Sequence, residues 1–283
     1  DHGCDWSSDV CSSDLTKAVA IDNATHEIIG ESIVMTSHED KMGVAAGVIE
    51  CFENCLKKND IAPGDVVFIA HSTTQATNAL LEGDVAQVGI IGMGKGGLEG
   101  ILAKRQTNIK DIDLGTGGVI KIHQNYIKEK DVNPENIEKN INELITQGAS
   151  VIVASKAFGV DSMREEQMVK EVAQKHNILV SVASEISKLY GLTRRTRTAA
   201  INSSILPKML NTAISTEESV RKTGIKVPLM IMRGDGGVMN IKEMKKRPVL
   251  TMLSGPAASV IGALMYLRRS EERRVGKECP RCV

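Results

Sequence analysis

The sequence is poor in aromatic residues and has no excess of charge of either sign. Aromatic residues make up 2% of the 283 residues, and 35 basic residues balance 35 acidic ones. A protein with so few rings to stack on bases, and with no basic excess, is not expected to bind nucleic acid. No apolar run approaches the length of a membrane span and no signal peptide is visible, so we expect a cytoplasmic protein without a membrane partner.

Both ends of the chain differ in character from the rest. Asp5–Leu15 reads DWSSDVCSSDL and Arg269–Cys279 reads RSEERRVGKEC, and both resemble sequencing-adapter DNA translated in frame. We therefore set residues 1–15 and 269–283 apart from the fold and expect them to be unpacked, because they offer little apolar surface. The alternative is a natural polar N-terminus and a natural basic tail. The rest of the chain keeps 35 less 5 basic and 35 less 7 acidic residues, a net charge of +2.

Cysteine is scarce once these ends are set aside, because four of the six cysteines lie in them. The two that remain, Cys51 and Cys55, are four residues apart on a predicted helix. This spacing is neither a disulfide framework nor a zinc pattern. We expect both thiols to lie in the core of a protein from a reducing compartment.

The rest of the chain alternates between short apolar runs and amphipathic segments. Strands that alternate with helices are typical of parallel sheets, so the sequence predicts an α/β fold. The first two strands are expected to form a hairpin, and the third is expected to be buried. The predicted strands cover 16–21, 28–34, 66–70, 87–91, 119–127, 151–155, 179–183 and 229–232, and the predicted helices cover 40–59, 75–81, 133–148, 162–176 and 196–222.

Capping residues and glycines refine this assignment. Asn133 followed by Pro134 predicts a helix start, and Ser162 with Glu165 predicts a capping box for the next helix. The run GMGKGG at 92–97 lacks the spacing and the Lys-Ser/Thr pair of a phosphate loop, so we interpret it as a flexible active-site or surface loop. A hinge predicted at 184–193 divides the fold into regions 16–188 and 189–268.

The stretch from 229 to 264 holds the densest set of signals. An apolar strand leads into the loop RGDGG, whose glycines let the backbone come close to a ligand or to another segment. Asn240 with Glu243 predicts a short helix, which Pro248 stops. Pro256 suits the first turn of a further helix, Ser254–Leu264, whose small residues predict close approach by another backbone.

Three separate motifs resemble the hydantoinase/oxoprolinase family, which includes ATP-dependent hydantoinases, 5-oxoprolinases and acetone carboxylase subunits. They are HSTTQATNALLEG at 71–83, SEISKLYGLTRRTRTAAINSSILPKM at 184–209, and RGDGGVM with RPVLTMLSGPAASVIGAL between 233 and 264. The resemblance extends from about Thr16 to Leu267. His71 stands where the family usually has Gly, and Asp235 where it often has Asn, so the substrate is left open.

The resemblance implies the actin-like ATPase architecture, which is ribonuclease H-like. In it, two glycine-rich loops hold ATP with a divalent metal, which is expected to be Mg²⁺. The first loop would end near Thr16 and the second would follow Leu267, and both positions adjoin the adapter-like segments. The chain by itself is therefore not expected to hydrolyse ATP. Ser254–Leu264 would be the interdomain helix, and a second catalytic subunit of the hydantoinase B type would be the partner.

Candidate site residues gather at predicted strand ends and helix starts, where parallel α/β sheets bind ligands and anions. His71, Thr73 and Asp235 are the candidate catalytic residues, with His71 as a base or metal ligand and Asp235 as an accessible carboxylate. The alternative is simple capping by Ser72 or Thr73, with His71 merely buried. The metal ligands stay open. The candidate cofactor-binding residues are Thr16, Thr74, Gly236, Gly237 and Gly255, and the candidate substrate-binding residues are Asn78, Glu185 and Arg233.

Charged residues near these positions allow more than one interpretation. Arg194, Arg195 and Arg197 predict either a clamp for a carboxylate or phosphate, or a solvated charged turn. Glu185 is either a site residue or an ordinary acid at a helix N-terminus. Arg233 and Asp235 either pair with each other or hold substrate or metal.

The resemblance implies an ATP-dependent hydrolase that opens a cyclic amide of the hydantoin or 5-oxoproline type. Transfer of phosphate to the amide oxygen would make a better electrophile, and water would then open the ring. One alternative is an ATP-dependent carboxylase of the acetone or acetophenone type. The other is a non-catalytic, nucleotide-dependent activator with the same architecture.

Overall fold

The structure, a computed structural model, describes the backbone of residues 15–35 and 44–275, and within these ranges the side chains of all but 44–45 and 266–275. The chain divides into two compact units. The first comprises Asp1–His71 and Asn211–Met230, and the second comprises Ser72–Leu210 and Ile231–Val283.

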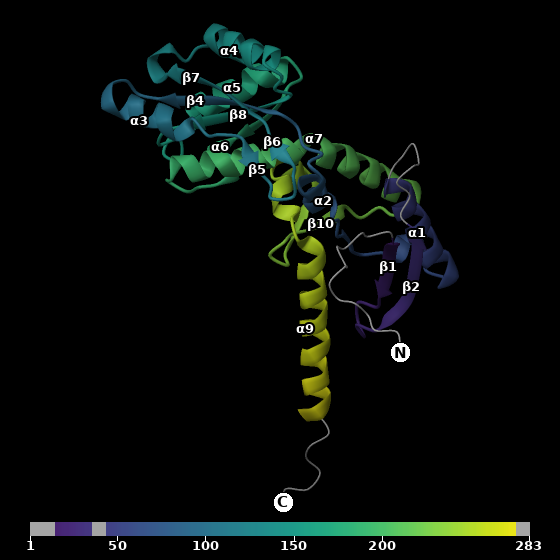
Figure 1. Cartoon of the computed structure of the whole chain (residues 1–283). Helices are drawn as coiled ribbons and strands as arrows, with labels where there is room; N and C mark the ends of the chain where they lie inside the picture. Colours follow the sequence, from purple (N-terminus) through teal and green to yellow (C-terminus); the bar gives the residue numbers. More distant parts are fainter. Residues whose placement is uncertain (1–14, 36–43, 276–283) are drawn as a thin grey trace, which may run out of the picture. The chain divides into compact units, whose positions relative to one another are not determined.

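The first unit is built on a β-hairpin that one helix covers (Figure 1). The two strands pair antiparallel with Thr16 opposite Val34, as the sequence predicts. Val48, Cys51 and Cys55 on the apolar stripe of the helix are buried, so both cysteines are core residues, as expected. The elements of this unit are β1 (Leu15–Ile21), β2 (Ile28–Met35), α1 (Val44–Lys58), a 3-10 helix (Pro63–Asp65), β3 (Ile69–His71) and the last part of α7 (Leu192–Lys222).

The strand predicted at 66–70 is wrong in its position and in its burial. β3 covers Ile69–His71 alone, while Val67 and Phe68 are exposed loop residues. The physical reason is that a short apolar run carries no periodicity, so apolar loop residues and buried strand residues look alike in it.

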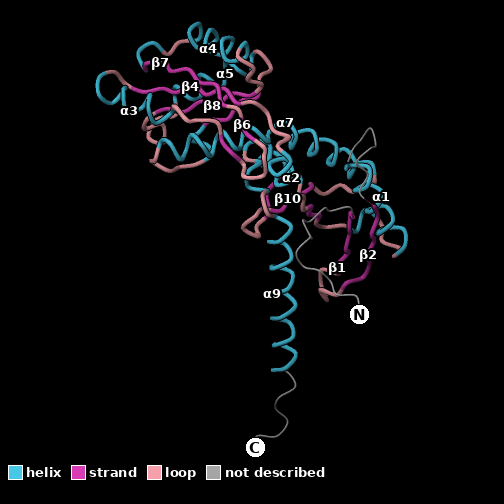
Figure 2. The backbone as a smooth tube through the Cα atoms, in the orientation of Figure 1, coloured by secondary structure: helices cyan, strands magenta, loops and turns pink. Residues whose placement is uncertain are grey.

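A parallel sheet of four strands forms the core of the second unit, in the order β7-β4-β8-β9. Figure 2 labels β7, β4 and β8 of this sheet. Val88 lies opposite both Ile122 and Val151, so the first strand in the sequence is central in the sheet. The sheet elements and their helices are β4 (Val88–Gly94), α3 (Gly97–Thr107), β7 (Ile122–Lys128), α4 (Pro134–Thr146), β8 (Val151–Lys156), α5 (Arg164–Lys175), β9 (Leu179–Val182) and α6 (Ala183–Ile186).

The other elements of the second unit are short, apart from two helices. They are α2 (Gln75–Glu82), β5 (Ile112–Asp113), β6 (Val119–Ile120), a 3-10 helix (Glu129–Asp131), the first part of α7, β10 (Leu229–Met232), β11 (Val238–Asn240), α8 (Ile241–Lys246), a 3-10 helix (Pro248–Thr251) and α9 (Ser254–Val275). The division between the units passes through both α7 and β10.

Helices cover both faces of the four-stranded sheet. α4 and α5 pack on one face, where Ile137, Leu144 and Val169 join the apolar side chains of the strands. α3 and the start of α7 pack on the other face, where Ser155 of β8 is hydrogen-bonded to Thr196 of α7 at 2.7 Å. The predicted α/β fold with parallel strands is therefore confirmed.

The glycine run at 92–97 is not the flexible loop that the sequence predicts. Gly92 and Gly94 are buried within β4. A Cβ added at Gly92 would lie 2.3 Å from Thr107 Oγ1, and one added at Gly94 would lie 2.8 Å from Ala103 Cβ. These glycines let α3 lie directly on the strand, so they serve packing.

Local signals at helix ends are confirmed in two places and wrong in one. The side chain of Asn133 accepts a hydrogen bond from the N–H of Asn136, and that of Asn240 accepts one from Glu243. Ser162 does not cap α5, whose N-cap is Met163 without a side-chain hydrogen bond. Glu165 instead accepts a hydrogen bond from the ammonium group of Lys156, and this ion pair replaces the capping box.

Candidate functional site

Two helices of the second unit begin beside each other, and polar side chains join them. The hydroxyl of Ser254, at the start of α9, donates a hydrogen bond of 3.1 Å to the carbonyl oxygen of Thr73, just before α2. The hydroxyls of Ser72 and Ser254 are 3.2 Å apart. The N–H of Leu253 donates to the hydroxyl of Thr77. We call this region, Ser72–Thr77 with Leu253–Gly255, the α2/α9 junction.

The sequence explains why both helices begin here. Thr73 Oγ1 accepts a hydrogen bond of 3.3 Å from the N–H of Gln75, which turns the chain into α2. Gly83 ends α2 in the left-handed conformation, with φ 72°. Pro256 lies in the first turn of α9, where its missing N–H costs nothing.

Leu253 enters α9 in an unfavourable backbone conformation. Its φ is 57°, in the left-handed region that costs a residue with a Cβ roughly 1–2 kcal/mol. Residues held in such conformations gather at functional sites. The strain therefore marks the α2/α9 junction as a place where geometry is maintained at the expense of stability.

The glycine loop between β10 and β11 packs against the segment that precedes α9 and against Ile261 of α9. The N–H of Gly234 donates to the carbonyl of Leu250, and a Cβ added at Gly234 would lie 2.1 Å from the carbonyl oxygen of Met252. A Cβ added at Gly236 would lie 2.8 Å from Ile261. The loop glycines thus permit close approach to another segment, as the sequence predicts.

Asp235 and Arg233 at the tip of this loop pair with each other. Asp235 also accepts a hydrogen bond of 3.0 Å from the N–H of Gly237. The hydrogen bond from Gly237, together with the charge of Arg233, lowers the pKa of Asp235. The carboxylate is therefore ionised and exposed, and of the two alternatives for this pair the structure contains the ion pair.

The part of α9 from Val260 to Leu264 is not covered as the sequence predicts, although Gly255, Ala257 and Ala258 in its first turns are half-buried. Val260, Ile261 and Leu264 are exposed, and a Cβ added at Gly262 would meet no atom within 4 Å. Among the described residues, the close approach to α9 comes from glycines of the β10–β11 loop. The predicted approach relied on small residues of the helix itself, which leave space but do not specify what fills it.

The electrostatics of the α2/α9 junction favour an anion. The first N–H groups of a helix carry partial positive charge and lack partners within the helix, and two helices start here. Thr74 is the N-cap of α2. The methyl carbon of Thr74 lies 3.8 Å from where a Cβ at Gly255 would be, so Thr74 and Gly255 are close in space.

His71 ends β3 in the first unit and is half-buried. Loss of hydration through burial lowers the pKa of His71 to about 4. The imidazole is therefore neutral at physiological pH. A neutral imidazole can accept a proton or bind a metal, and both sequence interpretations of His71 stay open.

The remaining candidate residues are distributed over the fold. Thr16 lies in β1 of the first unit, and residues before Leu15 are outside the described ranges. Asn78 lies in the first turn of α2, half-buried. Glu185 lies on α6, where it accepts hydrogen bonds from Gln167 and Lys170 of α5.

The arginine cluster at the start of α7 is divided between the interior and the surface, so its three side chains do not act together. Arg195 is fully buried and donates hydrogen bonds to the carbonyl oxygens of Leu189 and Lys156. Arg194 and Arg197 are exposed. Burial of the middle arginine follows from the helical period, which points it into the protein while its neighbours point outward.

Two buried polar residues stand out for which the sequence predicted no role. Asn202 of α7 donates to Ser181 and to the carbonyl of Lys246, and accepts from the N–H of Val249. It holds the segment that leads to α9, so it positions the α2/α9 junction indirectly. The visible signal is a lone Asn within the small and apolar residues of an amphipathic helix.

Lys156 is the second of these buried polar residues. It ends β8 in the core and pairs with Glu129 and Glu165. Burial alone would raise the pKa of Glu165, but the hydrogen bond and charge of Lys156 outweigh burial and lower it. No local pattern in the sequence identifies a lysine that pairs with acids 27 and 9 residues away.

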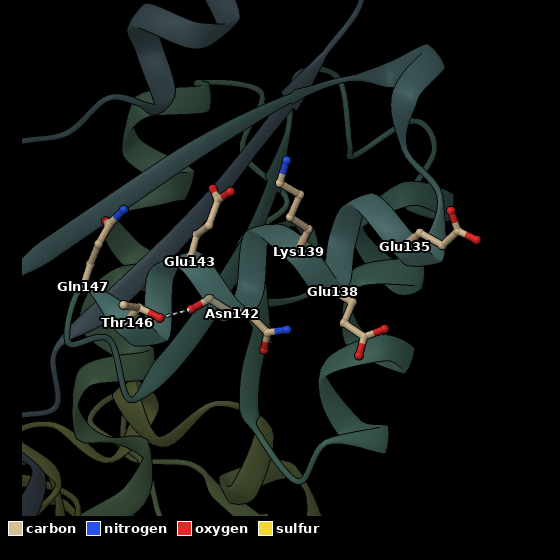
Figure 3. A pocket seen from close by; sticks show the side chains of 7 residues that line it. All are labelled: Glu135, Glu138, Lys139, Asn142, Glu143, Thr146 and Gln147. Atoms are coloured by element: carbon tan, nitrogen blue, oxygen red, sulfur yellow. Dashed lines mark hydrogen bonds between the residues drawn. The ribbon is translucent and has the colours of Figure 1, made fainter.

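A surface hollow on α4 differs from the α2/α9 junction in the side chains that line it (Figure 3). Its lining comes from one helix and its C-terminal turn, and Figure 3 shows side chains that point away from the helix in different directions. The one hydrogen bond drawn runs from the Thr146 hydroxyl to the carbonyl of Asn142, within the helix. Without converging groups from a second element, we assign no chemistry to it.

The residues that the structure describes offer no group of three or more His, Cys, Asp or Glu side chains that could hold a metal ion. The donor set at the α2/α9 junction, hydroxyls and helix N–H groups, suits an anion such as phosphate and does not suit Mg²⁺, which prefers carboxylates and water. No helix within the described ranges is long and apolar enough to cross a membrane.

Comparison with protein families matches most of the chain. A profile described as "Hydantoinase/oxoprolinase N-terminal region" covers residues 14–177, and one described as "Hydantoinase/oxoprolinase" covers residues 195–276. An uncharacterized protein of Methanocaldococcus jannaschii is 25% identical over 146 residues, which is 51% of this chain and 22% of that protein.

Two solved structures share the fold. A nucleotide-free structure of acetone carboxylase, which carboxylates acetone in an ATP-dependent reaction, superposes with a TM-score of 0.67 at 17% identity. The ATP-dependent caprolactamase of Pseudomonas jessenii superposes with a TM-score of 0.60 at 18% identity. They cover 91% and 87% of this chain, and the chain spans 39% and 38% of theirs.

Proposed function

Because the chain belongs to the hydantoinase/oxoprolinase family, we propose that it is part of an ATP-dependent hydrolase subunit that opens a cyclic amide of the hydantoin or 5-oxoproline type. The same proposal includes the actin-like, ribonuclease H-like architecture for the full-length protein. It also includes a second catalytic subunit of the hydantoinase B type as partner, and ATP with a divalent metal, expected to be Mg²⁺, as cofactors.

The observation that carries this proposal is the α2/α9 junction. Amide activation by ATP moves negative charge between a phosphate and an amide oxygen, so the protein contributes placement and electrostatic stabilisation above all. The N-termini of α2 and α9 are held together through Ser254 and Thr73, and each carries the positive end of a fixed helix dipole. Such dipoles need no rearrangement when charge develops.

Individual residues would contribute as follows. The N–H groups at the start of α2 and the hydroxyl of Thr74 would donate to an oxyanion of substrate or phosphate, and Gly255 would leave room for it. Asp235, ionised and exposed, is suited to hold a polar group of the substrate or a metal-bound water. When bound, the metal would screen the phosphate charges, although the described residues supply no cluster of ligands for it.

The test compares hydrolysis with its nearest alternative. The full-length protein, with its partner subunit, would be assayed for ATP-dependent loss of hydantoin, 5-oxoproline and caprolactam, and separately for bicarbonate-dependent use of acetone. We expect ring opening without bicarbonate. Product formation that requires bicarbonate would instead support the carboxylase alternative, which the likeness to acetone carboxylase favours.

A second assay links the activity to the junction. Thr74→Val removes one hydroxyl and should lower kcat by roughly a hundred- to a thousand-fold, as loss of one oxyanion donor does. Ser259→Ala removes a hydroxyl farther along α9, which bonds only to Gly255 of its own helix, and should leave kcat unchanged. Equal activity in both variants would separate the junction from the chemistry.

A further inference from the structure

The second unit carries an exposed apolar stripe on α3. Leu98, Ile101 and Leu102 are 82%, 67% and 57% exposed. Positions separated by three and four residues lie on one face of a helix. The opposite face of α3 is the one that packs on the sheet, through Gly100, Ala103 and Thr107. Large aliphatic side chains gathered in this way on a surface mark an interaction site.

A second exposed apolar surface adjoins the first. Thr193 of α7 donates a hydrogen bond to the carbonyl of Gln106 near the end of α3, which places the start of α7 beside α3. Leu189 and Tyr190, in the loop before α7, are exposed. They line a hollow of about 300 Å³ together with Gln106 and Arg194. A hollow of this size accommodates one or two side chains of a partner.

Hydrogen bonds from Arg195 and to Asp161 fix the loop that carries Leu189 and Tyr190. Buried Arg195 donates hydrogen bonds to the carbonyl oxygens of both residues, at 2.7 and 3.4 Å. The hydroxyl of Tyr190 donates to Asp161 at 2.8 Å. A loop whose backbone and Tyr190 side chain are already fixed binds a partner at a smaller entropic cost.

The exposed charged side chains of α3 and residues 188–197 are all basic, and the acidic Asp161 beside them is bonded to the Tyr190 hydroxyl. Glu99 is the one acidic residue in α3 and residues 188–197, and it is half-buried. Within the ranges that the structure describes, their exposed basic side chains make no ion pair, although such pairs form elsewhere, for example between Lys121 and Asp111. The exposed basic residues are Lys104, Arg105, Lys188, Arg194 and Arg197. The start of α7 adds the positive end of a long helix dipole.

We propose that this face, formed by α3 and residues 188–197, binds an acidic amphipathic helix of a partner protein. The apolar side of that helix packs on Leu98, Ile101 and Leu102, and one of its side chains enters the hollow beside Tyr190. Its carboxylates lie opposite Arg105 and Arg194. Aliphatic and tyrosine anchors with arginines at their border are the usual composition of protein interfaces. A nucleic acid would use the basic residues but would leave the aliphatic stripe in water.

The test uses synthetic helical peptides as probes. The first has leucines at helical spacing on one side and glutamates on the other, the second replaces the glutamates with lysines, and the third replaces the leucines with serines. Binding to the full chain is measured by fluorescence anisotropy at low and at high salt. We expect the acidic amphipathic peptide alone to bind, and to bind more weakly as salt rises.

Substitutions then locate the site. Ile101→Glu and Arg194→Glu should each weaken binding about ten-fold, the typical loss for a central apolar or arginine contact. Ile145→Glu and Lys139→Glu are matched controls on exposed positions of α4 (Figure 3 labels Lys139) and should leave binding within about two-fold. Leu98→Glu, at the most exposed of the three stripe positions, repeats the test in case Ile101→Glu does not fold.

Several outcomes would overturn the proposal. Equal binding of the lysine peptide would show that only apolar contact matters. Equal loss in the α4 controls would place the site elsewhere. Concentration-dependent dimerisation in sedimentation, abolished by Ile101→Glu, would show that a second copy occupies the face. Binding of duplex DNA that depends on Arg194 and not on Ile101 would show that the surface serves nucleic acid.

Discussion

The hydroxyl of Ser254 donates a hydrogen bond to the carbonyl oxygen of Thr73 across 181 positions of the sequence. Ser254 is buried, and the hydroxyl of Ser72 lies 3.2 Å from its own. Serine here has two partners from the segment that opens α2, so one side chain fixes the start of α9 against the start of α2.

Ser254→Ala should therefore destabilise the second unit by about 1–2 kcal/mol, because it leaves the Thr73 carbonyl buried without its partner. Ser259→Ala, at an exposed position on the same helix, is the matched control and should change stability by less than about 0.5 kcal/mol. Urea unfolding of both variants measures the difference. Equal midpoints would show that the hydrogen bond contributes nothing to stability.

Gly92→Ala should destabilise the second unit by about 1–3 kcal/mol, since the new methyl group would overlap the side chain of Thr107 and force α3 away from β4. Gly96→Ala makes the same change at a position where a Cβ meets nothing within 4 Å. We expect it to be neutral or slightly stabilising. Thermal melting compares the two, and similar melting temperatures would contradict the packing role of β4.

Lys156→Met should cost about 1–3 kcal/mol, because it leaves the half-buried carboxylates of Glu129 and Glu165 without their shared cation. Lys57→Met removes an exposed partner of Glu53 and should cost less than about 1 kcal/mol. Chemical denaturation at neutral pH measures both losses. A loss for Lys156→Met as small as that for Lys57→Met would mean that water screens the buried pair as well as the exposed one.

The ion pair between Lys156 and Glu165 predicts that the protein loses stability in acid. The folded pKa of Glu165 is below its unfolded value, so its contribution to stability is present above the unfolded value, near 4.5, and is lost as the pH falls through the lower, folded one. Stability should decline below about pH 4.5, and less so in Glu165→Gln. Identical acid profiles of the two proteins would assign the decline to other carboxyl groups.

His71 predicts a separate pH dependence at higher pH. Its folded pKa of about 4 is below the ordinary value of 6.5, so folding favours the neutral imidazole. The stability that depends on it is complete above pH 6.5 and is lost as the pH falls from 6.5 to 4, by about 3 kcal/mol. His71→Gln should flatten the profile in this window. A profile unchanged by the substitution would place His71 in water.

Leu253→Gly tests the strained entry to α9. Glycine relieves the left-handed conformation but adds freedom to the unfolded chain, so we expect a stabilisation of at most about 1 kcal/mol. Leu253→Ile, with a branched Cβ, should be destabilising instead. If both variants unfold at the same urea concentration as the original protein, the strain is not present in solution.

Local features could be predicted from the sequence because they depend on neighbouring residues. Asn133 and Asn240 cap helices through hydrogen bonds to N–H groups three residues away, and such bonds need no tertiary structure. The hairpin of β1 and β2 and the alternation of strands with helices follow from patterns a few residues long. The three motifs that resemble the hydantoinase/oxoprolinase family led to the family that the profile matches show.

Only the tertiary structure decided the features that depend on distant residues. Ser162 and Glu165 have the spacing of a capping box. In the structure Glu165 pairs with the ammonium group of Lys156 instead, because this ion pair stabilises the fold more than one capping hydrogen bond would. Glycines of the run 92–97 looked flexible, and Thr107 and Ala103 show that two of them are packed. Arg195 was a candidate for a ligand clamp, but its guanidinium donates hydrogen bonds to the backbone carbonyls of Lys156 and Leu189. The α2/α9 junction joins residues far apart in the chain, and its existence follows from how the unit packs, which no local pattern encodes.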